Sequence, residues 1–151
     1  MSGDLDGPLQ KLNQEIGAMN QKFSRSLKEL QNLVAMTDQF FIQNNILGSL
    51  KNTADLIIEE LFVNMVSYNT ETKEDILVEL LPKDKGIQIS ITDFDVERFD
   101  PASIDAVDTG ASLMDRQPGG LGLYLVLKMS DSIHYEYRNR QSKITVSVES
   151  S

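Results

Sequence analysis

The chain has 151 residues, of which 40% are hydrophobic and 25% are charged, a balance that predicts a single soluble globular domain and excludes a disordered or fibrous protein. The formal net charge of -9 disfavours binding to nucleic acid or to an anionic membrane. The absence of cysteine excludes disulfides and cysteine-ligated metals, and the single histidine, His134, excludes any site that needs two imidazoles.

The N-terminal residues carry apolar side chains at heptad spacing. This pattern has two interpretations. The first is a dimer contact, and the second is a structural segment, either a helix that lies on its own domain or a stretch that turns extended near residues 19–23. We treat 1–20 as an N-terminal helical or interaction segment and 21–151 as the main domain. The apolar positions are Leu5, Leu9, Leu12, Ile16, Met19 and Phe23.

Apolar stripes of helical period then predict two helices, over residues 26–47 and 49–69. Ser26 is placed to cap the first helix, with Glu29 as its capping-box partner, and Gly48 is placed to end it. Ser49 is placed to cap the second helix.

Alternating apolar residues predict two β-hairpins, one over 76–92 with a turn at 82–86 and one over 133–148 with a turn at 139–142. Between them, residues 95–118 read as a long loop, and a third helix is expected over 121–129. The predicted fold class is α+β, a two-layer sandwich in which a mostly antiparallel mixed sheet is covered on one face by three helices.

Glu60 and Asn64 lie four residues apart on the second predicted helix, at the margin of its apolar stripe. Such a pair is either a solvated glutamate with a boundary asparagine, or a functional pair. In the functional case the carboxylate orients an attacking hydroxyl or water, and the amide oxygen ligates Mg²⁺.

Two further features admit both a structural and a functional reading. Asp93 ends a predicted strand, where it either makes a turn or accepts a hydrogen bond from the amino group of a base. Gly119, Gly120 and Gly122 precede the third helix, where they either start that helix or let the backbone approach a phosphate. The spacing matches neither a P-loop nor a dinucleotide-binding fingerprint.

These features occur in the order Glu60-Leu-Phe-Val-Asn64, Asp93, loop, then Gly119-Gly120-Leu121-Gly122-Leu123. This order resembles the GHKL (Bergerat-fold) ATP-binding domain shared by histidine kinases, Hsp90 and gyrase. The stretch from Phe99-Asp100-Pro101 to Tyr135 is most similar to the stand-alone anti-sigma-factor serine/threonine kinases. The resemblance covers about residues 21–149.

The resemblance implies a role for each motif. Glu60 would be the general base, Asn64 would ligate Mg²⁺, and Asp93 would bind the adenine amino group. The cofactors would be ATP and Mg²⁺. The glycine box over the phosphates would consist of Gly119, Gly120, Leu121 and Gly122, with residues 95–118 as a lid.

The sequence departs from the family pattern at the first glycine box, where Asp93-Phe94-Asp95 stands in place of Asp-x-Gly. The carboxylate of Asp95 either repels the phosphates or only alters the turn. The last hairpin carries Gln141-Ser142-Lys143 where the family has a Gly-Thr or Gly-Asn pair.

The N-terminus does not resemble a secretory signal and no apolar run is of membrane-spanning length, so we expect a cytoplasmic protein. The resemblance implies a homodimeric, ATP-dependent serine/threonine kinase and anti-sigma regulator. Its partners would be a STAS-domain antagonist, which it phosphorylates, and a sigma factor or other output protein, with no nucleic acid and no membrane. The alternative is a catalytically weak or inactive module of the same fold that sequesters a partner protein.

Overall fold

The computed structural model describes residues 17–46, 48–97 and 126–149. Its centre is a five-stranded sheet in which every described pairing is antiparallel. From one edge to the other, the strands are β1 (Met19–Phe23), β2 (Ile76–Lys83), β3 (Gly86–Phe94), β5 (Gln141–Glu149) and β4 (Ser132–Arg138).

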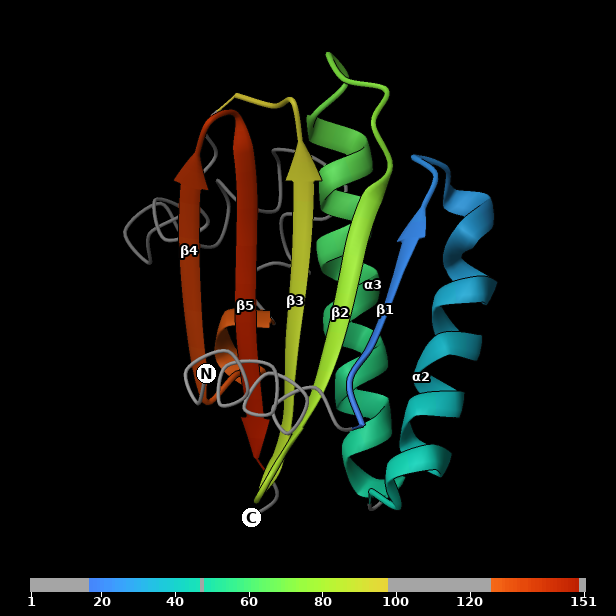
Figure 1. Cartoon of the computed structure of the whole chain (residues 1–151). Helices are drawn as coiled ribbons and strands as arrows, with labels where there is room; N and C mark the ends of the chain where they lie inside the picture. The colour runs from blue at the N-terminus through green and yellow to red at the C-terminus, as the bar shows by residue number, and fades with distance from the viewer. Residues whose placement is uncertain (1–16, 47, 98–125, 150–151) are drawn as a thin grey trace, which may run out of the picture.

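Two long helices cover one face of this sheet (Figure 1). They are α2 (Leu30–Asn44) and α3 (Lys51–Tyr68), each preceded by a short 3-10 helix, η1 (Leu27–Glu29) and η2 (Gly48–Leu50), and residues 126–129 are also helical. The predicted α+β two-layer fold is therefore confirmed.

The core lies between the helices and the sheet. On β2, alternate residues point toward the helices, so Ile76, Val78 and Leu80 are all buried. Phe23 of β1 packs edge-on against Phe62 of α3, with ring centroids 6.3 Å apart. A fully buried side chain of this size contributes about 1.5–3 kcal/mol. The core thus fixes the position of α3 on the sheet.

The starts of the predicted helices differ in detail from the prediction. Ser26 caps η1 as predicted, because its side chain accepts a hydrogen bond from the Lys28 amide. The capping-box role of Glu29 is wrong, since its carboxylate accepts from the amide and hydroxyl of Ser24 instead. Ser49 does not cap α3, because it lies inside η2.

The end of α2 also corrects the prediction. Asn45, not Gly48, ends this helix, with a left-handed φ of 56°. Asparagine tolerates that conformation, and it places the Ile46 amide on the Phe41 carbonyl at 3.1 Å.

The strand predictions are confirmed in the described part of the chain, but both turns are shorter than predicted. Residues 84–85 link β2 to β3, and residues 139–140 link β4 to β5. Residues 19–23 are extended and pair with β2, which supports the second interpretation of that part of the heptad pattern. Asn139 and Arg140 both have positive φ, as a two-residue hairpin turn between β4 and β5 requires.

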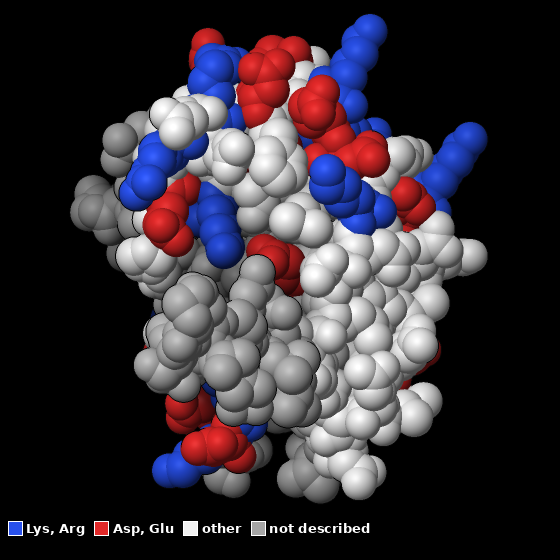
Figure 2. All heavy atoms as spheres, in the orientation of Figure 1, with Lys and Arg blue, Asp and Glu red and all other residues white. Residues whose placement is uncertain are grey.

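Charged side chains are unevenly distributed over the face shown in Figure 2. They gather toward the upper end, whereas the side over α2 shows few of them. Asp38 is the only charged residue between Leu30 and Asn44. No helix among the described residues is both long and apolar enough to cross a membrane.

Candidate functional site

Helix α3 carries Glu60 and Asn64 one turn apart, as predicted. Asn64 is 2% exposed, and its amide oxygen Oδ1 is buried with no hydrogen-bond partner among the described residues. A buried polar atom without a partner costs free energy unless a ligand or ion satisfies it. The position therefore suits a ligand atom better than a structural one.

Glu60 is half-buried on the same helix. Burial raises the pKa of its carboxyl above the ordinary value, and the neighbouring charge of Glu59 raises it further. A carboxylate with a raised pKa accepts a proton more readily, which is the property that a general base needs. Its chemistry thus matches the role that the resemblance implies.

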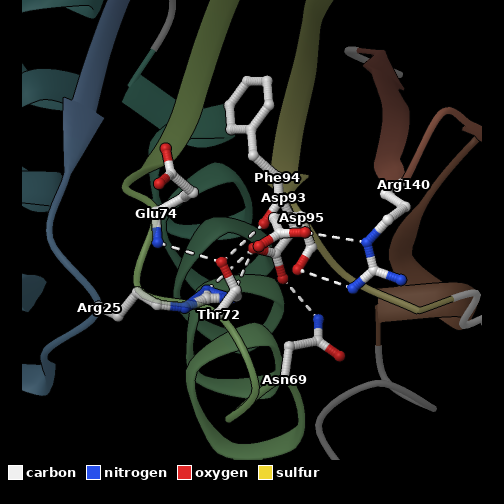
Figure 3. A network of polar contacts seen from close by, with 8 residues as sticks. All are labelled: Arg25, Asn69, Thr72, Glu74, Asp93, Phe94, Asp95 and Arg140. Carbon is white, nitrogen blue, oxygen red and sulfur yellow. Dashed lines mark hydrogen bonds and ion pairs between the residues drawn. The ribbon is translucent and has the colours of Figure 1, made fainter.

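Asp93 lies at the end of β3 and is completely buried. Its Oδ1 accepts hydrogen bonds from Nη1 and Nη2 of Arg25, at 2.9 and 2.5 Å, and its Oδ2 accepts from Nδ2 of Asn69 (Figure 3). Burial raises the pKa of Asp93, whereas the hydrogen bond from Asn69 and the charge of Arg25 oppose that shift. The carboxylate is therefore held in place from two sides.

The loop between α3 and β2 is fixed against the same strand end. The hydroxyl of Thr72 donates to the Phe94 carbonyl at 2.9 Å and accepts from the Glu74 amide at 3.1 Å. Ser142 of β5 is buried and lies opposite Asp93 in the strand register. Thr72 thus holds this loop against the strand end that carries Asp93.

Asp95 stands where the family pattern has glycine, and the backbone explains how it can do so. Its φ is 58°, in the left-handed region that favours glycine and that aspartate tolerates better than most residues. The Nε of Arg140 donates to its carboxylate at 2.9 Å, and the Val96 amide donates to the Arg140 carbonyl at 3.0 Å. The glycine-like turn is thus retained, and the added charge is paired.

Sequence reasoning missed Arg25 and Asn69, the two residues that hold Asp93. Arg25 is 68 residues from Asp93 in the chain and Asn69 is 24 residues away, so no local pattern links them. Only the structure shows that β1 and β3 run in the same direction, which places Arg25 and Asp93 at the same end of the sheet.

The predicted glycine box, Gly119, Gly120, Leu121 and Gly122, lies outside the described residues, as does most of the predicted lid. Two hollows of about 370 and 390 Å³ are found on the face of the sheet opposite α2 and α3. Both are lined by Glu79 and Lys143, so they lie on the opposite side of the sheet from Asp93.

Comparison with known proteins agrees with this geometry. The crystal structure of the SiaB–SiaC complex from Pseudomonas aeruginosa contains a chain of similar fold, with a TM-score of 0.63 and 10% sequence identity. The match covers 98% of this chain and 100% of that chain. No curated protein matches the chain significantly. Residues 23–148 match the family described as the histidine kinase-like ATPase domain. The chain therefore belongs to the histidine kinase-like ATPase domain family.

Proposed function

We propose that this protein is an ATP-dependent serine/threonine kinase and partner-switching regulator. It transfers the γ-phosphate of ATP to a serine or threonine of a STAS-domain antagonist, and it holds a sigma factor or other output protein. The observation that carries the proposal is the pair on α3. The buried amide oxygen of Asn64 has no hydrogen-bond partner in the described part of the chain, and it lies one helical turn from the half-buried Glu60. Membership of the histidine kinase-like ATPase family supports ATP as the phosphate donor.

Asn64 fits a magnesium ligand because a neutral amide oxygen is a hard donor and its own Oδ1 lacks a partner among the described residues. Magnesium, when bound, would neutralise charge on the phosphates. Asp93 would accept the adenine amino group, and Gly119, Gly120, Leu121 and Gly122 would contact the phosphates.

Glu60 would take the proton of the attacking hydroxyl. The serine or threonine oxygen then bonds to the γ-phosphorus as the bond to ADP breaks, and the proton moves to the Glu60 carboxylate. Because burial and Glu59 raise the pKa of Glu60, this carboxylate is a stronger base than an exposed one. The rate should therefore fall as the pH is lowered through that raised pKa.

One observation favours the alternative, a binding module that sequesters a partner. Among the described residues, all three exposed large apolar side chains, Leu27, Val34 and Ile42, lie on η1 and α2. Exposed apolar groups gathered on helices of few charges are typical of a protein contact, and α2 carries one charged residue, Asp38. The similar solved structure is itself a complex of two proteins. Partner binding is common to both candidate functions, and catalysis distinguishes them.

The deciding experiment combines calorimetry of ATP binding with phosphotransfer to STAS-domain proteins. We expect Asn64→Ala to abolish the magnesium dependence of ATP binding. We expect Glu60→Gln to keep binding and to slow transfer by roughly 10²–10⁴-fold. The matched control is Glu136→Gln, which removes an exposed charge on β4 and should change neither quantity. A folded protein that binds no ATP would leave only the binding module.

A further inference from the structure

Asp93 is inaccessible in this structure. Its side chain has no exposed surface, and its oxygens already accept three hydrogen bonds from Arg25 and Asn69. If Asp93 is the acceptor for the base, as the proposed function holds, a nucleobase cannot reach it until one of the covering groups moves. Identifying that group also identifies what limits nucleotide binding.

Of the two residues bonded to Asp93, Asn69 is the less free to move. It is the C-cap of α3, its amide donates to the Met65 carbonyl at 3.0 Å, and its side chain has only two rotatable bonds. With its shorter side chain, Asn69 can move its carboxamide a smaller distance from Asp93 than a longer side chain could.

Arg25 is the freer residue. It lies in the short connection between β1 and η1, where Glu29 holds the backbone through Ser24. Its four rotatable side-chain bonds let the guanidinium turn outward while that backbone contact stays in place. Arg25 can thus leave Asp93 without unfolding an element.

The hydrogen-bonding capacity of the Arg25 side chain is also only partly used in this position. The side chain is 10% exposed, and its Nε is buried with no hydrogen-bond partner among the described residues. The ion pair stabilises this position, whereas the unpaired Nε and the desolvation of two charges oppose it. These opposing contributions reduce the net free energy that holds the guanidinium on Asp93, which favours exchange of this contact with a ligand.

We propose that Arg25 occludes the base subsite: its guanidinium and the amino group of the nucleobase occupy Asp93 alternately, so that Arg25 sets nucleotide affinity. This inference rests on the proposed function, because it takes Asp93 as the base acceptor. The protein with Arg25 on Asp93 is autoinhibited, and nucleotide binds to the fraction of molecules in which Arg25 has turned out.

The test is calorimetric titration of the full chain with Mg·ATP and, separately, with Mg·tripolyphosphate, which has no base. The apparent association constant equals the intrinsic one multiplied by the fraction of molecules that are open. If Arg25 covers Asp93 in about nine molecules of ten, removing it should therefore lower the apparent Kd for ATP about tenfold. We therefore expect Arg25→Gln to lower the Kd for ATP relative to the Kd for tripolyphosphate by about that factor. Loss of the positive charge of Arg25 affects the binding of both anionic ligands, so the ratio isolates the effect on the base.

Two variants accompany Arg25→Gln. Arg138→Gln makes the same substitution at an exposed position of β4 and should leave the ratio unchanged. Arg25→Lys keeps the positive charge beside Asp93 but loses the paired donors, and it should show a smaller decrease of the ratio. If thermal melting shows that Arg25→Gln is unfolded, the lysine variant decides the question.

The outcomes separate this inference from the function on which it rests. If the wild type binds ATP and neither folded Arg25 variant lowers the ratio, the occlusion is wrong and the nucleotide site stands. If the folded wild type and Arg25 variants bind neither ATP nor tripolyphosphate, the proposed nucleotide site is wrong and the occlusion falls with it.

Discussion

Two aspartate–arginine pairs lie at one end of β3, with their aspartates two residues apart. The two pairs join the same chemical groups but differ in solvent exposure and in where the arginine comes from. Asp93 and Arg25 are 0% and 10% exposed, whereas Asp95 and Arg140 are 62% and 51% exposed. The first pair joins a strand end to a segment 68 residues away, and the second joins it to a neighbouring hairpin turn. Figure 3 shows both pairs together.

The comparison teaches that burial determines how strongly such an ion pair affects the stability of the fold. An exposed ion pair contributes little to the free energy of unfolding because water and salt screen it. The role of Asp95–Arg140 is therefore to neutralise a charge and to hold a turn. A buried pair has a large cost and a large gain, and removing one partner strands the other. Asp93 is therefore the position where a competing ligand or a substitution has the greater effect.

The largest expected effect comes from Asp93→Ala. This change leaves Asn69 without its acceptor and Arg25 without its counter-charge, and we expect the free energy of unfolding to fall by about 2–3 kcal/mol. The measurement is urea unfolding followed by circular dichroism, with Asp95→Asn as the exposed counterpart, for which we expect a change within about 0.5 kcal/mol. Equal losses at the two positions would contradict the comparison.

A smaller effect is expected from the backbone at position 95. Asp95→Val places a β-branched residue at a φ of 58° and should lower the free energy of unfolding by about 1–2 kcal/mol. Asp95→Gly loses the same ion pair with Arg140 but suits the turn, so it serves as the matched control and should cost nothing measurable. If both variants were equally destabilised, the ion pair rather than the turn would determine stability here.

The smallest effect is a pH dependence from Asp93. Because burial raises its folded-state pKa above the ordinary 3.8, the folded protein binds this proton more tightly than the unfolded chain. Its contribution to the free energy of unfolding is therefore greatest in acid and is lost as the pH rises from about 3.8 through the folded-state pKa, with a slope of at most about 1.4 kcal/mol per pH unit. We would measure urea unfolding of the wild type and of Asp93→Asn between pH 3.5 and 7. A difference between them that does not change with pH would refute the shift.

Local chemistry was predictable from the sequence. Period-2 alternation located β2 and β3, and the helical stripe located α3 with Glu60 and Asn64 on it. Errors arose where two local signals competed. Gly48 was predicted to end the helix because glycine favours the left-handed conformation. Asn45, which precedes Gly48 in the chain, adopts that conformation and ends α2.

The rest of the candidate site depends on tertiary contacts. Whether Asp93 was a turn residue or a buried acceptor could not be settled from its neighbours in sequence, because its partners come from the segment after β1 and from the end of α3. The two alternatives for Asp95, repulsion of the phosphates or only an altered turn, stayed open for the same reason, since its ion-pair partner Arg140 is 45 residues away.

The strand order has a consequence for how the chain folds. The hairpins β2–β3 and β4–β5 are local, but β3 pairs with β5, so Ile91 lies opposite Ile144. Until β5 has been synthesised, one edge of β3 lacks a partner and its backbone donors and acceptors are open to other chains. Joining the two hairpins is a non-local step that closes a long stretch of chain, and such steps are slow. A nascent or partly folded molecule therefore exposes the strand that carries Asp93, and this strand is where misassembly between chains would begin.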